Sequence, residues 1–130
     1  TVETFPSTDE GVAWMVTAKE RSIFHTGDLN WWHWPEEDAA WNRNMAANFK
    51  RYTEPLRGRR ADLAMLPLDP RLGKDGYLGP QYFLELMDIR HFLPMHQWEH
   101  FEFTDEFLRD CPQFAPITTK IRHNLESFTF

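Results

Sequence analysis

The sequence predicts a single α/β domain, because predicted strands and helices alternate along its 130 residues. Short runs rich in β-branched and aromatic residues, bounded by turn-forming residues, indicate the strands. Apolar residues at helical spacing indicate the helices. The order is strand, strand, strand, helix, strand, helix, strand, helix, and a hydrophobic fraction of 42% is enough to form a core.

The chain begins with extended segments. Residues 1–5 (Thr-Val-Glu-Thr-Phe) are β-like, and residues 7–11 form a turn-rich loop. Val12 to His25 reads as a hairpin around a polar turn at residues 18–21. Chain ends are more often polar and frayed than extended, so we expect this chain to be cut from something longer.

A helix is predicted to start near Pro35, which is followed by three acidic residues in the first turn, where the helix dipole favours them. Its apolar face is Trp41, Met45, Phe49 and Tyr52, at steps of four, four and three residues. The helix should end before Pro55 and Gly58.

The remaining predicted elements are shorter. They are a buried strand over 62–68, a loop over 72–79, a helix over 80–87, a strand over 91–95 and a helix capped by Thr104 that runs through Arg109. From Ile117 onward the sequence favours no single element.

The composition excludes several classes of function. A formal charge of −6 argues against a nucleic-acid or anionic-membrane surface, and the basic run Arg57–Arg60 reads as a solvated turn beside a glycine. No apolar run approaches the ~18 residues of a membrane span. The single cysteine, Cys111, excludes an internal disulfide and fits a reducing compartment, so we expect a cytoplasmic protein.

The most informative stretch is Ile23–Trp34 (Ile-Phe-His-Thr-Gly-Asp-Leu-Asn-Trp-Trp-His-Trp). A Gly-Asp turn should place Asp28 at the end of a strand, where a rigid element aims the carboxylate into an open loop. Trp31, Trp32, His33 and Trp34 then form a run of rings that is costly to expose. They either fill the core, line a pocket or contact a partner. Together with the net negative charge of the chain, these rings favour a hydrophobic or cationic ligand.

Three polar residues end predicted strands: Asp28, Asp69 and His96. Ligands of α/β sheets gather at the carboxyl ends of strands, and Asp and His are both good ligands for zinc and similar ions. We expect Asp28 and His96 to be metal ligands.

Nearby polar residues have simpler interpretations. His25 should donate a hydrogen bond to a metal-ligand side chain rather than coordinate the metal itself. Asp69 should pair with Arg71 in a structural turn, although it also belongs to the candidate pocket. His96 and His100 could share a helical face, but the residues between them show no helix pattern.

Phe-His-Thr-Gly-Asp-Leu at 24–29 and Phe-Leu-Pro-Met-His at 92–96, in this order, resemble motifs of the metallo-β-lactamase-fold hydrolases. The Trp-Trp-His-Trp run and Leu66–Gly73 are similar to one bacterial branch of that superfamily. The resemblance runs from about Phe5 to His100, which is most of the chain.

The resemblance implies a four-layer αββα sandwich of two halves, with metal ions at one edge. It implies that Asp28 is the bridging carboxylate and His96 the last histidine ligand. The His-x-His-x-Asp-His motif of the amino-terminal half is missing. Thr8 stands about where many relatives have another histidine, so one metal site is expected to be altered, with Asp9 as the possible substitute ligand.

Residues 1–130 therefore resemble the carboxyl-terminal half alone: one mixed sheet covered by helices on one face. The resemblance implies attack of a metal-bound hydroxide on an ester, amide or phosphoester of a small-molecule substrate, with zinc, manganese or iron in the complete protein. Side chains such as Val12, Trp14 and Ile23 should form a sheet face that the missing half or a second copy of the chain must cover. This chain alone should be inactive. The alternative is a non-catalytic module for dimerisation or small-ligand binding, with a degenerate metal site.

Overall fold

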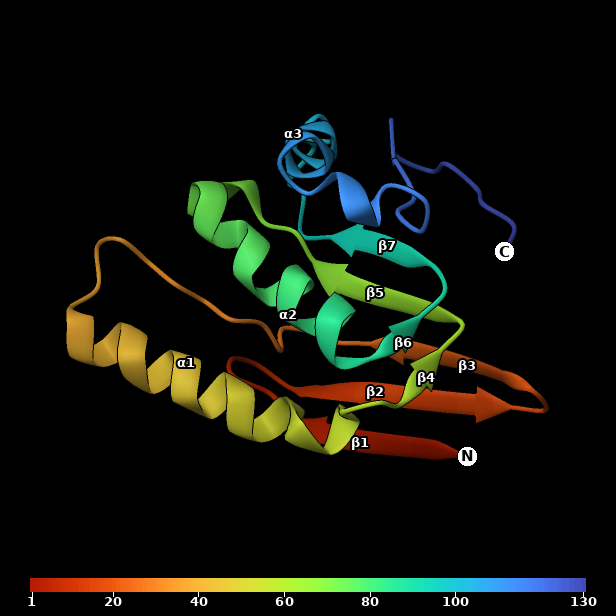
Figure 1. The fold of residues 1–130 in the computed structure, drawn as a ribbon, viewed down its shortest axis with the longest axis horizontal. Coiled ribbons are helices and arrows are strands. Elements are labelled where there is room, and N and C mark those ends of the chain that lie inside the picture. Colours follow the sequence, from red (N-terminus) through yellow and green to blue (C-terminus); the bar gives the residue numbers. More distant parts are fainter.

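A computed structural model describes all residues from 1 to 130, and its centre is a mixed sheet of five strands (Figure 1). The strands are β1 (Val2–Pro6), β2 (Val12–Ala18), β3 (Arg21–His25), β5 (Leu63–Pro67) and β7 (Phe92–Met95), and they lie side by side in this order. The first three strands are antiparallel, whereas β3, β5 and β7 are parallel. The predicted α/β class and the predicted hairpin are confirmed.

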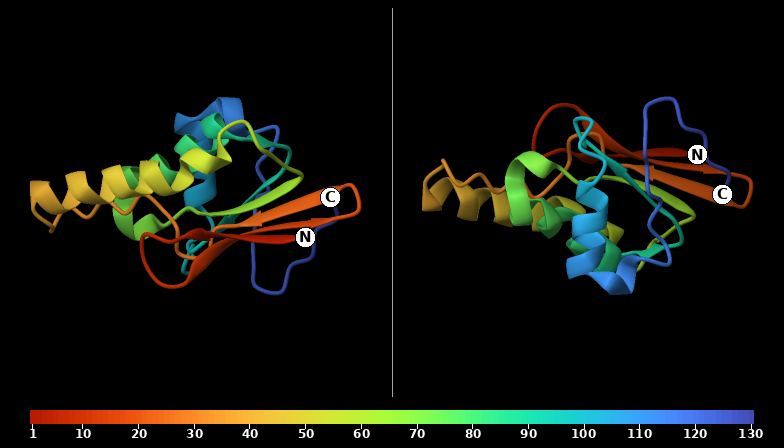
Figure 2. Two further views of the ribbon diagram at one scale, coloured as in Figure 1. Left: turned by 90° about the horizontal axis from the view of Figure 1, so that it is seen from below. Right: turned by 90° about the horizontal axis from the view of Figure 1, so that it is seen from above.

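Three helices cover one side of this sheet (Figures 1 and 2). They are α1 (Ala39–Thr53), α2 (Leu78–Leu86) and α3 (Phe103–Asp110). Three 3-10 helices adjoin them: Glu54–Leu56 follows α1, Pro70–Tyr77 precedes α2, and Pro112–Phe114 follows α3. The core between the sheet and the helices is rich in aromatic rings. Phe83 of α2 is fully buried and meets Phe24 of β3 and Phe49 of α1 edge-on, with ring centroids 5.6 and 5.3 Å apart.

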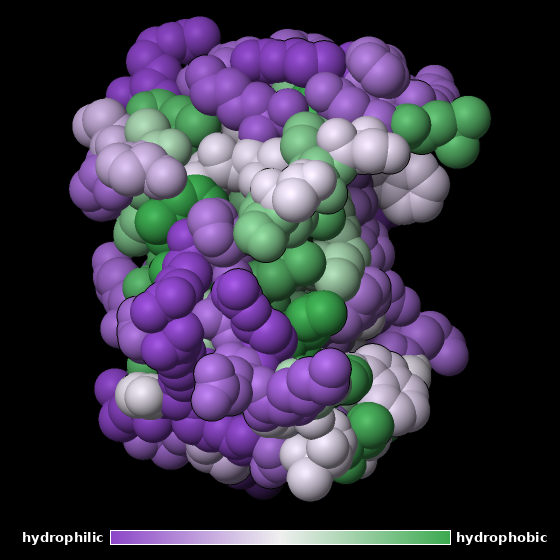
Figure 3. Space-filling view, turned by 90° about the vertical axis from the view of Figure 1, so that its right-hand side faces the viewer, coloured by the Kyte–Doolittle hydropathy of each residue, from purple (hydrophilic) through white to green (hydrophobic).

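The opposite side of the sheet carries no helix, and its side chains are largely apolar. The strand register puts Val2, Val12, Trp14, Val16, Ile23, His25, Leu63, Met65, Leu93 and Met95 on this side, which we call the open face. Trp14 is 43% exposed and Ile23 39% exposed. The carboxyl-terminal tail crosses this side near the chain termini (Figure 2), and hydrophobic side chains reach the surface there between polar ones (Figure 3).

The two edges of the sheet differ. Residues 117–119 run beside β7, where the Phe92 N–H donates to the Ile117 carbonyl at 2.7 Å and the Thr119 N–H donates to the Phe92 carbonyl at 2.8 Å. The tail, which sequence patterns left unassigned, thus covers this edge. The outer edge of β1 pairs with no strand.

The long helix starts later than predicted, because Asp38 caps it by accepting from the Trp41 N–H at 2.7 Å. Its buried face also differs from the predicted one. Phe49 is fully buried, but Trp41 is 37% exposed and Asn42 is buried in its place. The difference arises because the preceding loop packs on Asn42, whose amide exchanges hydrogen bonds with the backbone of Trp34.

Two other predictions about elements were wrong in detail, and a third was incomplete. The predicted loop at 72–79 is mostly the 3-10 helix Pro70–Tyr77, and α3 begins at Phe103, before Thr104. The basic run does begin with the predicted exposed turn, at Arg57 and Gly58, but it leads into a two-residue strand, β4 (Arg60–Ala61), which pairs in parallel with β6 (Asp88–Ile89). Such short pairings depend on tertiary contacts rather than on local pattern.

Cys111 is buried at the end of α3, where it accepts a hydrogen bond from Gln81 at 3.1 Å. Burial raises the pKa of its thiol, which agrees with the structural role predicted for it. None of the helices combines the length and the hydropathy needed to cross a bilayer.

Candidate functional site

The parallel strands β3, β5 and β7 bring Asp28, Asp69 and His96 to the same end of the sheet, because each residue follows the carboxyl end of its strand. We call this end of the sheet the Asp28–His96 edge. The turn before Asp28 is tightly fixed. The Thr26 N–H donates to the Met65 carbonyl at 3.2 Å, and Gly27 has φ +55°. A Cβ on Gly27 would lie 2.9 Å from the Val12 carbonyl oxygen, so only glycine fits this turn.

Asp28 and His96 meet directly. The Asp28 Oδ1 and His96 Nε2 atoms are 3.3 Å apart, and both side chains are partly exposed to solvent. Two ligand atoms of a tetrahedral zinc ion, each ~2.0 Å from the metal, are separated by about the same distance. The atom types and the spacing therefore fit two ligands of one ion, although their role as ligands stays a prediction.

Trp32 holds this pair in place from one side. Its indole N–H donates to the Asp28 carbonyl at 2.9 Å, and its ring meets the His96 imidazole edge-on at 5.9 Å between centroids. Trp32 is almost fully buried. Trp32 is thus covered by the protein rather than exposed, and it contacts both residues of the pair.

His96 lies at the start of a turn with an unusual backbone. His96, Trp98 and Glu99 all have positive φ, at 58°, 51° and 64°. Non-glycine residues in this region are disfavoured and cluster at functional sites.

The neighbours of His96 anchor this turn. The Gln97 amide is buried and donates to Thr104 Oγ1 of α3 at 2.6 Å, while the Trp98 indole N–H donates to Asp69 Oδ2 at 3.3 Å.

Asp69 is fully buried and already paired. Arg71 donates to its carboxylate from Nε and from a terminal nitrogen, the shorter contact being 2.6 Å, and also from its backbone N–H. This hydrogen bonding with Asp69 raises the pKa of Arg71. The predicted structural Asp–Arg pair is confirmed, and the carboxylate is occupied by it.

The Arg71 guanidinium also lies between two indole rings. It is 5.4 Å from the ring centroid of Trp34 and 4.5 Å from that of Trp98. Trp34 in turn stacks on Trp32, with 7° between the ring planes. The sequence analysis did not predict that Trp98 contacts Asp69 and Arg71. Only the order Asp-Pro-Arg after a strand indicated that Asp69 and Arg71 pair.

His25 and Asp9 do not join the pair. His25 lies on the open face, where its Nδ1 accepts the Gly27 N–H at 2.9 Å. It therefore holds the turn before Asp28, and the predicted hydrogen bond from His25 to a metal-ligand residue is not formed. Asp9 is exposed. No group of three or more His, Cys, Asp or Glu side chains is placed to hold a metal ion.

Thr8 holds the loop that follows Asp28. Its Oγ1 donates to the Asn30 carbonyl at 2.7 Å and accepts the Asn30 N–H at 3.1 Å.

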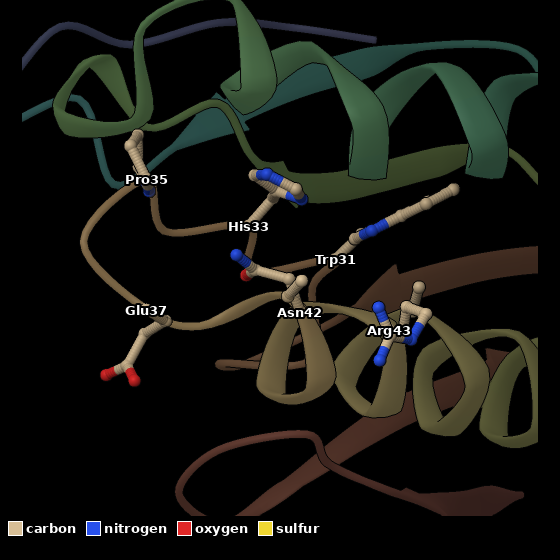
Figure 4. A pocket seen from close by; sticks show the side chains of 8 residues that line it. Trp31, His33, Pro35, Glu37, Asn42 and Arg43 are labelled. Atoms are coloured by element: carbon tan, nitrogen blue, oxygen red, sulfur yellow. The ribbon is translucent and has the colours of Figure 1, made fainter.

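We call residues 31–34 the tryptophan loop. Successive side chains of this loop point alternately to its two sides. Trp32 and Trp34 face the Asp28–His96 edge, whereas Trp31 and His33 face α1. Trp31 packs on Phe49 with ring centroids 5.9 Å apart. A groove of about 480 Å³ opens between Trp31, His33 and α1 (Figure 4).

No family model, no curated protein and no solved structure matches this chain. Its function is therefore inferred from the geometry of the edge itself.

Proposed function

We propose that this chain is the carboxyl-terminal half of a metal-dependent hydrolase with a metallo-β-lactamase-like αββα fold. The observation that supports this most strongly is the meeting of Asp28 and His96 at 3.3 Å. They come from loops after different strands, and the resemblance of the sequence assigns ligand roles to the same two residues. Zinc, manganese and iron all accept this combination of carboxylate oxygen and imidazole nitrogen.

The open face supports the same proposal. A four-layer sandwich buries two sheets against each other, and here one sheet has helices on one side and apolar side chains such as Trp14 and Ile23 on the other. The proposed cover is the amino-terminal half of the fold or a second copy of this chain. Either would bring further ligands to the edge.

At such a site the ion would activate water and polarise the ester, amide or phosphoester of a small-molecule substrate. Asp28 and His96 would hold it. Trp32 keeps the Asp28 backbone in position through its indole N–H and shields one side of the imidazole from water. Two ligands rarely compete with water for an ion, so the chain alone should bind metal weakly and be inactive.

Equilibrium dialysis against zinc tests the ligand roles. The isolated chain should bind zinc more weakly than about 1 μM, and Asp28→Ala and His96→Ala should each remove what binding there is. Asp9→Asn, an acid outside the pair, is the matched control and should change nothing. Sub-micromolar binding by the isolated chain, or binding that survives Asp28→Ala, would contradict the proposal.

The complete protein gives the second test. The reading frame upstream of Thr1 should encode a His-x-His-x-Asp-His motif, and the full product should contain stoichiometric metal that is lost in Asp28→Ala. A second candidate function is a non-catalytic module for dimerisation or small-ligand binding, favoured by the lack of a third ligand near the pair. Absence of metal from every preparation of the full product would decide for this module.

A further inference from the structure

The groove beside the tryptophan loop is a second site, on the side of the loop that faces away from Asp28 and His96. One wall is a single face of α1, and the other wall is the loop (Figure 4). Its volume of about 480 Å³ lies within the usual range for small-ligand sites. The lining residues are Trp31, His33, Pro35, Glu37, Ala39, Asn42, Arg43 and Ala46.

The free polar groups of this groove are mainly N–H donors. Arg43 is exposed and takes part in no ion pair of the protein, and His33 has no hydrogen-bond partner. The indole N–H of Trp31 is buried and has no partner either. Buried donors without an acceptor are rare in folded proteins, and this one belongs to a residue in the wall of the groove.

The acceptors of the groove are occupied or turned away. Both polar atoms of the Asn42 amide are bonded to the backbone of Trp34, at 3.1 and 2.8 Å. The Glu37 carboxylate points outward from the rim, away from His33 and Arg43 (Figure 4). Lys50, two turns further along α1, adds a positive charge 4.7 Å from the ring centroid of Trp31. Arg43 and Lys50 thus place two positive charges beside Trp31, while the carboxylate of Glu37 is turned away from them.

We propose that this groove binds a small organic anion, a carboxylate or phosphate carried on a flat apolar body. The anionic group would lie between His33 and Arg43, where it accepts charge-assisted hydrogen bonds. The flat body would pack against Trp31 and the alanines of α1. This ligand differs from the hydrophobic or cationic one expected from overall composition, and the proposal stands whether or not the chain is a hydrolase.

NMR titration of the chain tests the site with three probes of one shape. Benzoate and phenyl phosphate should shift the indole N–H signal of Trp31, which is assigned by its loss in Trp31→Phe, and the matched cation benzylamine should not. Stronger binding of one of the two anions identifies the group as carboxylate or phosphate.

Arg43→Gln should weaken the binding of the better anion about tenfold, and Arg43→Lys should weaken it less. The control is Arg51→Gln on the same helix, whose guanidinium already bonds Asn48 and Tyr52 and which should leave binding unchanged. His33→Gln provides a second variant if Arg43→Gln does not fold. Benzylamine binding as tight as that of the anions, unchanged affinity in Arg43→Gln and His33→Gln, or no binding of either anion at millimolar concentration would each overturn the proposal.

Discussion

Asp62 shows how one side chain can tie several strands together. The residue is mostly buried between β4 and β5, accepts from the backbone N–H of Ser22 in β3 at 2.9 Å, and pairs with Arg60 at 2.7 Å. The hydrogen bond from Arg60, helped by the one from Ser22, lowers the pKa of Asp62 to about 2. Its carboxylate therefore stabilises the fold only while it is ionised.

We expect the free energy of unfolding to reflect this pKa. The folded pKa, about 2, is below the ordinary value of 3.8, so the stabilisation is complete above pH 4. It should fall as the pH drops from 4 towards 2. Urea unfolding at several pH values should show wild type and Asp62→Asn converging over this range. Glu20→Gln, at an exposed turn, should show no such convergence, and a gap between wild type and Asp62→Asn that persists at pH 2 would contradict the prediction.

Single residues also mark what the sequence could reveal about the site. The position of Asp28 and His96 after the ends of strands could be predicted, because Asp28 follows a Gly turn and His96 follows a Pro-Met pair. Trp98 could not, because its bond to Asp69 depends on the positive φ angles of the turn after β7. A tryptophan with positive φ has no sequence pattern that distinguishes it from a tryptophan in an ordinary loop.

At the scale of elements, the start of α2 packs unusually closely on the loop after Asp28. Gly79 lies against Asn30, and a Cβ at position 79 would come 1.7 Å from the Asn30 Oδ1. Both polar atoms of the Asn30 side chain are buried without partners. This contact fixes the distance between α2 and the tryptophan loop.

Gly79→Ala should therefore destabilise the protein by about 1–3 kcal/mol through overpacking, although alanine is the better helix former by ~1 kcal/mol. Asn30→Ala should cost little, because it removes polar atoms that already lack partners. The double variant should recover most of the loss, giving a non-additive cycle in urea unfolding. Additive effects of the two changes would show that the contact does not exist in solution.

The elements that sequence patterns missed share a physical reason. Hydrophobic periodicity located α2 and the strands around it, because those segments bury one face. The 3-10 helix Pro70–Tyr77 contains Gly73 and Gly76 and reads as loop, since its helical shape follows from packing Tyr77 on Phe103 and Phe107. The two-residue strands β4 and β6 are too short to have a period at all.

At the scale of the whole molecule, the open face decides how the chain behaves in solution. Monomeric proteins rarely expose contiguous apolar patches of more than a few hundred Å². Here apolar side chains from all five strands share one uncovered side. The apolar open face could be predicted in part from the sequence, because β2 carries apolar side chains on both of its faces.

The chain alone should therefore self-associate through this face. Trp14→Lys should lower the association constant at least tenfold, because it would bury an unpaired charge in the contact. Trp41→Lys, at an equally exposed tryptophan on α1, should not. Sedimentation velocity over a range of concentrations measures both. A wild-type chain that stays monomeric, or equal effects of the two variants, would assign the open face no role in association.

The ring of Phe130 limits how that face can be covered. Phe130 lies beside Ile23 and Leu63, near the amino ends of β3 and β5, and its ring is 5.1 Å from that of His91. A layer that packs on this face therefore meets the ring of Phe130 at one end of the sheet. Asp28 and His96 stand at the opposite end, after the carboxyl ends of β3 and β7, where Phe130 leaves them accessible to the covering layer.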